Sequence, residues 1–159
     1  MNRCALITGA SGGIGRAAAL RLAADGFDIA ACWHSDEAGA AMLGVELEKI
    51  GVRFRLYQAD VADFSQVKSI FEDALEYFGD VSVLVNNAGM AQQKLFTDIS
   101  EDEFDRICAV NFKSIYNCCM RLSISKPSRR MSSMVLSPAM VPRISLIPLL
   151  SIGTDMALA

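Results

Sequence analysis

The first pattern with chemical potential is a glycine-rich turn near the amino terminus, Thr8-Gly9-Ala10-Ser11-Gly12-Gly13-Ile14-Gly15. Residues 3–7 before it predict a buried strand, and residues 14–24 after it predict a helix. Unpaired amides at a helix N-terminus, together with the positive end of the helix dipole, favour a phosphate. Glycines permit the sharp turn and the close approach of backbone to a pyrophosphate. The strand–turn–helix context favours a nucleotide-binding site over the alternative, an ordinary tight loop.

Further polar residues follow the later predicted strands. Asp60-Val61 comes after a third strand, Asn86-Asn87-Ala88-Gly89 comes directly after a fourth, and Asn111 lies inside the next predicted helix. The paired asparagines could simply close a turn and join neighbouring strands, and Asp60 could be only a helix cap. Asn111 is unfavourable in mid-helix because its amide competes for backbone hydrogen bonds, which indicates a specific role.

Strands and helices alternate in short steps over the first 120 residues. Strands are predicted at 3–7, 28–33, 52–59 and 81–85, and helices at 14–24, 36–50, 64–78 and 100–121. Asp63 with Gln66 and Ser100 with Glu103 are the predicted caps of the last two helices, and Gly26, Gly51 and Gly79 the predicted ends of the first three. This order predicts an α/β fold, a Rossmann-type doubly wound parallel sheet with helices on both faces.

Composition changes abruptly near residue 120. Residues 1–120 contain 17 acidic residues, 10 basic residues and no proline, whereas residues 121–159 contain one acidic residue, five basic residues and all four prolines. We therefore interpret 1–120 as a dinucleotide-binding half domain and 121–159 as an atypical tail. The prolines disfavour long helices and central strands, so the sheet is expected to be truncated after its fourth strand and the following helix, with the fourth strand near an open edge.

Overall composition excludes several function classes. With 52% hydrophobic residues and a net charge of −3, the chain is expected to form a globular domain that binds neither nucleic acid nor membrane. The apolar stretches are too short for a membrane span or a signal peptide. Five cysteines without a C-x-x-C pair are typical of reduced thiols, and no metal site is predicted. A cytoplasmic location is expected.

The turn fits the T-G-x-x-x-G-x-G pattern of the short-chain dehydrogenases/reductases, and the motifs at Asp60, Asn86 and Asn111 follow in that family's order. On these residues the chain resembles that family over residues 1–120, and is most similar to its 3-oxoacyl-[acyl-carrier-protein] reductases. Residues 86–119 are also similar to a reductase that completes the aminopentanol modification of elongation factor P.

The resemblance implies a nicotinamide dinucleotide cofactor and a small carbonyl substrate, a ketone or 3-oxoacyl thioester. The cofactor contacts that it implies are Thr8, Gly9, Ser11, Gly12, Gly13, Ile14, Gly15, His34, Ser35, Asp60, Val61, Asn87, Ala88 and Gly89. Among these, Asp60 and Val61 are expected at the adenine ring. Asn111 is expected to hold a water in the catalytic proton relay. The resemblance also implies a homo-tetramer or dimer formed through the helices around and after Asn111, and this chain holds only part of that surface.

The end of the second predicted strand bears on the choice between NAD and NADP. NAD-specific relatives place an acid there for the ribose hydroxyl, but this chain has Trp33, followed by His34 and Ser35, which could contact a 2′-phosphate. Asp36 lies close by, and Gly12 stands where many NADP users have Arg or Lys. The balance favours NADP(H).

The family's catalytic tyrosine and lysine are not found. In relatives a tyrosine donates the proton, a lysine four residues later lowers its pKa, and an upstream serine polarises the carbonyl. The three tyrosines, Tyr57, Tyr77 and Tyr116, are followed four positions later by Val61, Val81 and Met120. Ser137 is the nearest candidate for the serine.

Two functional hypotheses follow: a reductase by ancestry that is inactive as it stands, or a non-catalytic nucleotide-binding fragment or pseudoenzyme. We interpret the tail as out of frame, which translation of the underlying DNA in its other two frames would test.

Overall fold

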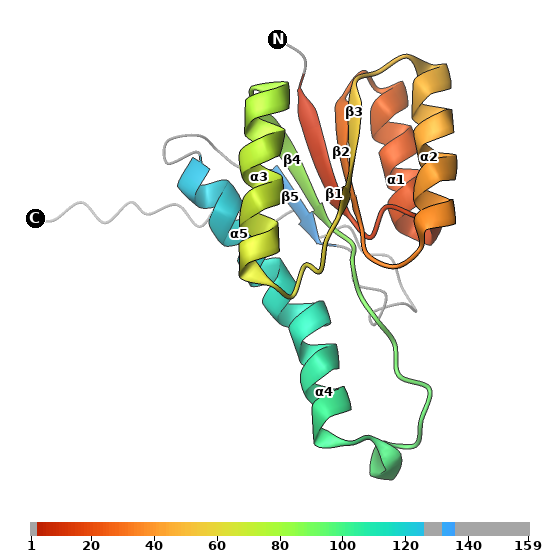
Figure 1. Cartoon of the computed structure of the whole chain (residues 1–159), viewed down its shortest axis with the longest axis vertical. Helices are drawn as coiled ribbons and strands as arrows, with labels where there is room; N and C mark the ends of the chain where they lie inside the picture. The colour runs from red at the N-terminus through yellow and green to blue at the C-terminus, as the bar shows by residue number, and fades with distance from the viewer. Residues whose placement is uncertain (1–2, 126–131, 136–159) are drawn as a thin grey trace, which may run out of the picture.

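The computed structural model describes residues 3–125 and 132–135. Its centre is a five-stranded sheet in the order β3-β2-β1-β4-β5, in which every neighbouring pair is parallel (Figure 1). The strands are β1 (Cys4–Thr8), β2 (Asp28–Trp33), β3 (Phe54–Gln58), β4 (Val81–Asn86) and β5 (Ser132–Val135). This order places β1 and β4 at the middle of the sheet, so the loops after them meet at one edge.

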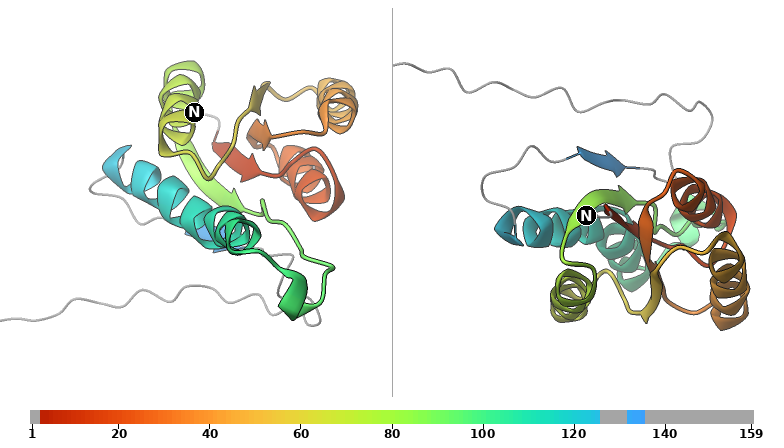
Figure 2. Two further views of the ribbon diagram at one scale, coloured as in Figure 1. Left: turned by 60° about the horizontal axis from the view of Figure 1, so that its bottom comes forward. Right: turned by 90° about the horizontal axis from the view of Figure 1, so that it is seen from above.

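Helices cover both faces of the sheet (Figure 2). The helices are α1 (Gly13–Ala24), α2 (Glu37–Ile50), α3 (Phe64–Phe78), α4 (Glu101–Cys108) and α5 (Ser114–Ser125), with a short 3₁₀ turn, η1 (Phe96–Asp98), before α4. α1 and α2 pack on one face, and α3 and α5 pack on the other. The predicted doubly wound, Rossmann-type parallel sheet is confirmed.

The packing on both faces of β1 explains why its first four residues, Cys4–Ile7, are all apolar. Ala5 and Ile7 belong to the core under α1 and α2, whereas Cys4 and Leu6 belong to the core under α3 and α5. A parallel strand covered on both sides buries every residue, and all five residues of β1 are buried. The rigid centre therefore lies directly beneath the glycine-rich turn.

Local signals in the sequence set the helix boundaries. The Asp63 carboxylate accepts hydrogen bonds from the amides of Ser65 and Gln66 and caps α3, and Ser100 with Glu103 forms a capping box on α4. α2 and α3 end at Gly51 and Gly79. These predictions are confirmed.

The helix predicted over residues 100–121 is interrupted. Residues Ala109–Lys113 form one π-helical turn, η2, in which the amide of Ser114 donates to the carbonyl of Ala109, five residues back. The chain then continues as α5 to Ser125. A π turn holds one residue more than an α turn, so it changes which side chains face the core. Val110 and Asn111 are both buried in it.

The structure adds one strand to the four that the sequence predicts. β5 pairs with β4 from Val83↔Ser132 to Asn86↔Val135. The expected stop after the fourth strand and the open edge at that strand are thereby corrected. Four residues of β5 lie between Pro127 and Pro138, which leaves room for a short strand without proline. Ser137, the candidate catalytic serine, lies outside the described residues, as does most of the tail.

Candidate dinucleotide-binding site

Thr8, the last residue of β1, joins the two central loops. Its hydroxyl accepts hydrogen bonds from the amides of Asn87, at 3.0 Å, and Ala88, at 2.9 Å, and donates to the carbonyl of Val85. The Asn87 carboxamide returns two bonds, both 3.0 Å long, to the carbonyls of Thr8 and Gly9. The predicted glycine-rich turn and the Asn-Ala-Gly motif are therefore one connected structure, as strand-joining asparagines allow.

Two glycines in the turn satisfy specific steric demands. Gly9 has a φ of +64°, a left-handed conformation that side chains rarely adopt. A Cβ on Gly15 would lie 2.2 Å from the Gly9 carbonyl oxygen and 2.4 Å from Asn87 Nδ2. Since no side-chain atom fits there, α1 packs directly on the turn.

The N-terminus of α1 suits an anionic ligand. Its N-cap, Gly12, makes no side-chain hydrogen bond to the first turn, and that turn contains no acidic residue. The first amides of a helix have no partner within the helix and carry positive partial charge. Gly13 and Ile14 are exposed, while Ser11 and Gly12 are half-buried. The turn thus presents backbone donors at the carboxyl edge of the sheet, which fits a pyrophosphate.

The end of β2 lies beside this turn, since the Ala10 amide donates to the Cys32 carbonyl at 2.9 Å. His34 and Ser35 follow β2 as exposed residues, and the His34 carbonyl accepts from Gln58 Nε2 at 3.2 Å. The Asp36 carboxylate caps α2 through the Gly39 amide. Its other oxygen would lie 3.8 Å from a Cβ placed on Gly12. The negative charge of Asp36 therefore lies beside the glycine-rich turn. It also follows His34 and Ser35, whose side chains could donate hydrogen bonds to a phosphate.

The turn after β3 is tied to the helix after β4. Asp60 accepts from the Ala62 amide at 2.9 Å and from Arg106 Nη1 at 2.7 Å, and its own amide donates to Gln66. Burial raises the pKa of Asp60, but the bonds from Arg106 and the Ala62 amide outweigh it, so the pKa lies below its ordinary value. The residue that caps α3 is Asp63, so Asp60 is not the cap.

Both polar atoms of the Asn111 side chain are hydrogen-bonded to one neighbour, Met90. Its Oδ1 accepts from the Met90 amide at 2.8 Å, and its Nδ2 donates to the Met90 carbonyl at 2.9 Å. Met90 directly follows Asn-Ala-Gly, so this pair fixes the path of the chain leaving the central loop. The structure accordingly gives Asn111 a specific partner, as its position in mid-helix predicts.

Sequence reasoning missed two polar residues beside the site, Arg106 and Asn117. Asn117 is only 1% exposed, and its Nδ2 donates to the carbonyls of Val61 and Ala62 at 3.1 and 3.2 Å. Asn117 could have been found by the argument used for Asn111, because it too is an asparagine in the middle of a helix. Arg106 gave no such signal, because arginine is a good helix former on any exposed face.

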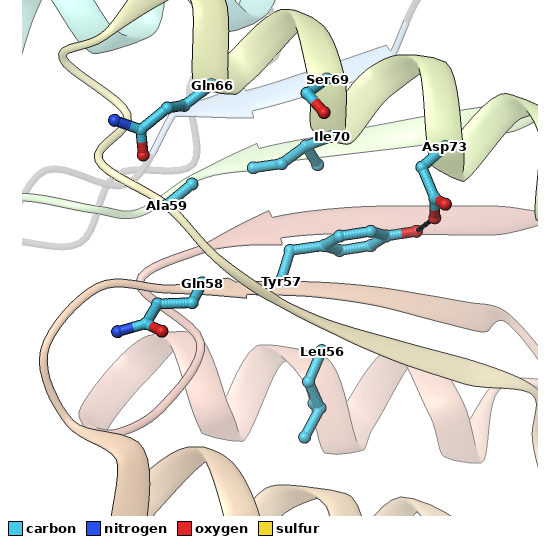
Figure 3. Close-up of a pocket in the computed structure, with 8 residues that line it drawn as sticks. All are labelled: Leu56, Tyr57, Gln58, Ala59, Gln66, Ser69, Ile70 and Asp73. Carbon is cyan, nitrogen blue, oxygen red and sulfur yellow. Dashed lines mark hydrogen bonds between the residues drawn. The ribbon is translucent and has the colours of Figure 1, made fainter.

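A pocket of about 340 Å³ lies between β3 and α3 (Figure 3). Tyr57 and Asp73 line it and are hydrogen-bonded to each other at 2.6 Å. None of its lining residues belongs to the predicted cofactor contacts. At one end of the pocket, Gln58 donates a hydrogen bond to the His34 carbonyl and Gln66 accepts one from the Asp60 amide. The pocket thus lies behind the loops of the site.

Two kinds of site do not occur among the described residues. In this part of the chain, no three His, Cys, Asp or Glu side chains are grouped so that they could hold a metal ion. No helix among them has the length and apolar character needed to cross a bilayer.

Comparison with known proteins agrees with the geometry of the turn. A family model for short chain dehydrogenases matches residues 3–131. The chain belongs to the short-chain dehydrogenase family. The chain is 37% identical over 123 residues to the 3-oxoacyl-[acyl-carrier-protein] reductase FabG of Staphylococcus epidermidis, covering 77% of this chain and 50% of that protein. It is 39% identical over 117 residues to a short-chain dehydrogenase/reductase of Armillaria gallica, covering 73% and 45%. The chain therefore spans about half the length of the curated relatives it matches.

Solved structures show the same relationship. A short chain dehydrogenase from Burkholderia cenocepacia in complex with NADP superposes with a TM-score of 0.74 at 34% identity, over 77% of this chain and 50% of that one. A blue fluorescent protein from a metagenomic library, in complex with NADPH, gives 0.73 at 38% identity, over 77% and 51%. The family and the Rossmann-type fold of this chain are thus established.

Proposed function

We propose that this chain binds NADP(H) and corresponds to the cofactor-binding half of a reductase for a ketone or a 3-oxoacyl thioester. The observation that carries the proposal is the glycine-rich turn, where Gly15 admits no side chain and α1 directs uncapped amides outward. The NADP and NADPH complexes of related structures and the 3-oxoacyl reductase name of the FabG relative support the cofactor and substrate class.

Different groups of residues would contact different parts of the cofactor. The amides of the Thr8–Gly15 turn would hold the pyrophosphate, His34 and Ser35 the 2′-phosphate, and Asp60 and Val61 the adenine. Asn87, Ala88 and Gly89 would border the nicotinamide side, and Asn111 would hold a relay water. When bound, the cofactor supplies the hydride for carbonyl reduction.

We further propose that these 159 residues do not catalyse that reduction by themselves. Proton donation in the family needs a tyrosine with a lysine four positions later, and no tyrosine in this sequence has one. Tyr57 is also unsuited to the task, because burial and its bond to Asp73 raise its pKa, which opposes ionisation. This observation favours the second candidate function, a nucleotide-binding fragment or pseudoenzyme.

A pair of matched substitutions tests the binding proposal. Trp33 is the only tryptophan, and it precedes His34, so energy transfer from Trp33 to NADPH reports binding. Gly15→Ala adds a methyl group 2.2 Å from a carbonyl oxygen of the turn, whereas Gly44→Ala, in α2 and outside the predicted contacts, adds one whose nearest neighbour is the end of the Leu56 side chain at 3.3 Å. We expect Gly44→Ala to bind like the wild type and Gly15→Ala to bind at least about tenfold more weakly, since a shift in the turn misdirects its amides.

Circular dichroism of both variants checks that they are folded. A wild-type chain that gives no NADPH signal would contradict the binding proposal, as would a folded Gly15→Ala variant that binds as well as Gly44→Ala. Catalysis is measured separately, as NADPH consumption with an acetoacetyl thioester. We expect no consumption above background, and steady turnover would overturn the proposal that the chain is inactive.

A further inference from the structure

The helix after β4 reaches two separate loops of the site. Arg106 on α4 and Asn117 on α5 both bond the turn formed by Asp60, Val61 and Ala62, while Asn111 between them bonds Met90. The three side chains come from one nearly continuous helix with a π turn at its centre (Figure 1). Side chains of one helical segment are therefore hydrogen-bonded both to the loop after β3 and to the loop after β4.

Asn117 holds the turn through its backbone. Its amide group donates to two successive carbonyls, those of Val61 and Ala62, at 3.1 and 3.2 Å. The bonds are buried, and a buried carbonyl that loses its donor costs more than the bond itself contributes. The two bonds fix the orientation of successive peptide planes directly after Asp60.

Arg106 holds the same turn through a side chain. Its Nη1 lies 2.7 Å from Asp60 Oδ2, and the other carboxylate oxygen of Asp60 accepts the Ala62 amide. The preceding residue, Ala59, is bonded to Trp33 at the end of β2. The turn thus adjoins the loop that carries His34, at the carboxyl edge where an open parallel sheet binds ligands.

We propose that Arg106 and Asn117 are positioning residues that set the affinity of the site for the adenosine half of the dinucleotide. The inference rests on the proposed function, because Asp60 and Val61 are the proposed adenine contacts. Arg106 and Asn117 act through the Asp60–Ala62 turn and need not contact the ligand. Asn111, which is hydrogen-bonded to Met90, likewise sets the affinity of the site for the nicotinamide half.

The division between halves provides the test. Adenosine 2′,5′-bisphosphate carries only the adenosine half of NADPH. A defect confined to the Asp60–Ala62 turn weakens both ligands by the same factor, whereas a defect at Met90 weakens NADPH alone. Asn117→Leu replaces the amide with a bulkier apolar group of the same branched heavy-atom skeleton, and Arg106→Met keeps an unbranched stem without the charge. Leu122→Ala is the matched control, since Leu122 is equally buried in α5 but belongs to the apolar core.

Calorimetric titration of each variant with both ligands, together with its melting temperature, gives the readouts. We expect Asn117→Leu to weaken both ligands by about tenfold, Arg106→Met by about threefold, and Asn111→Ala to weaken NADPH only. Leu122→Ala is expected to lower the melting temperature and leave both affinities within about twofold of wild type.

Equal binding of adenosine 2′,5′-bisphosphate by wild type and by folded Asn117→Leu or Arg106→Met would overturn the inference. The inference also fails if Leu122→Ala weakens that ligand as much as Asn117→Leu does. Should Asn117→Leu fail to fold, Arg106→Met decides, because its side chain is 40% exposed and its loss leaves the core intact. A wild type that binds neither ligand refutes the proposed function itself.

Discussion

At the scale of single residues, one carboxylate opposes the proposed choice of cofactor. Asp36 caps α2 through the Gly39 amide, and its free oxygen stands beside Gly12. A 2′-phosphate held by His34 and Ser35 would lie near that charge. Two like charges several ångströms apart in a solvated site repel each other by about 1 kcal/mol, roughly a fivefold change in affinity. Asp36 therefore caps α2 and, under the proposed function, also disfavours a bound 2′-phosphate.

Asp36→Asn separates the two functions, since asparagine is as good an N-cap as aspartate but carries no charge. We expect the ratio of NADPH affinity to NADH affinity to rise about fivefold, and His34→Ala to lower it. Titration of both cofactors monitored by Trp33 fluorescence gives the ratio. Glu48→Gln changes the net charge equally at the far end of α2 and is expected to leave the ratio unchanged. An unchanged ratio in Asp36→Asn would mean that the 2′-phosphate is bound elsewhere.

Residue types alone predicted part of the site. A specific role for Asn111 is predicted because asparagine is unfavourable in the middle of a helix. The structure gives its side chain Met90 as a partner. The same argument applies to Asn117, but its partners lie more than 50 positions away along the chain. Such a pairing depends on how α5 packs against α3, which no local pattern specifies.

At the scale of elements, the start of α3 shows how a cap stabilises the fold. Asp63 Oδ1 accepts from the amide and hydroxyl of Ser65 and from the amide of Gln66, while its other oxygen accepts from Gln66 Nε2. These bonds, led by the one from the Ser65 hydroxyl, lower the pKa of Asp63 from 3.8 to about 2. Because the folded state favours the ionised form, the charge on Asp63 stabilises the protein at every pH above 3.8.

That contribution is lost as the pH falls from 3.8 through about 2, where Asp63 becomes protonated in the folded state as well. We expect Asp63→Ala to be less stable than wild type at pH 7, and the difference to shrink over this range. Asp63→Asn keeps the cap without the charge, so its deficit at pH 7 is expected to be smaller. Urea unfolding at a series of pH values measures the differences. A deficit in Asp63→Ala that persists undiminished at pH 2 would contradict the assignment.

Two elements, the π turn and β5, could not be predicted from sequence patterns. The π turn at Ala109–Lys113 changes only the backbone hydrogen bonds, and its residues are as compatible with an α-helix as with a π-helix. β5 has four residues, and a run that short between prolines gives little periodicity to read. By contrast, the caps at Asp63 and Ser100 are local chemistry and were predicted correctly.

At the scale of the whole molecule, a row of apolar side chains lies exposed along the helix after β4. Phe112 is 71% exposed and Tyr116 is 60% exposed, and Met120 and Ile124 follow at the same four-residue spacing. Residues spaced by four lie on one face of a helix, so these four form a continuous stripe. A contiguous apolar surface of this kind is costly in water and is typical of an interface between proteins.

We propose that a second copy of the chain covers this stripe, in keeping with the dimers or tetramers that the family resemblance implies. In the double variant Phe112→Asp/Tyr116→Asp, each partner helix would bring carboxylates into an apolar contact, so we expect the dimer to dissociate. Val45→Asp with Met42→Asp is the matched control, since both residues are similarly exposed on α2. Light scattering during gel filtration measures the mass, which is 17.2 kDa for a single chain. A wild type of that mass at micromolar concentrations would contradict self-association, and dissociation in the α2 control as well would place the interface elsewhere.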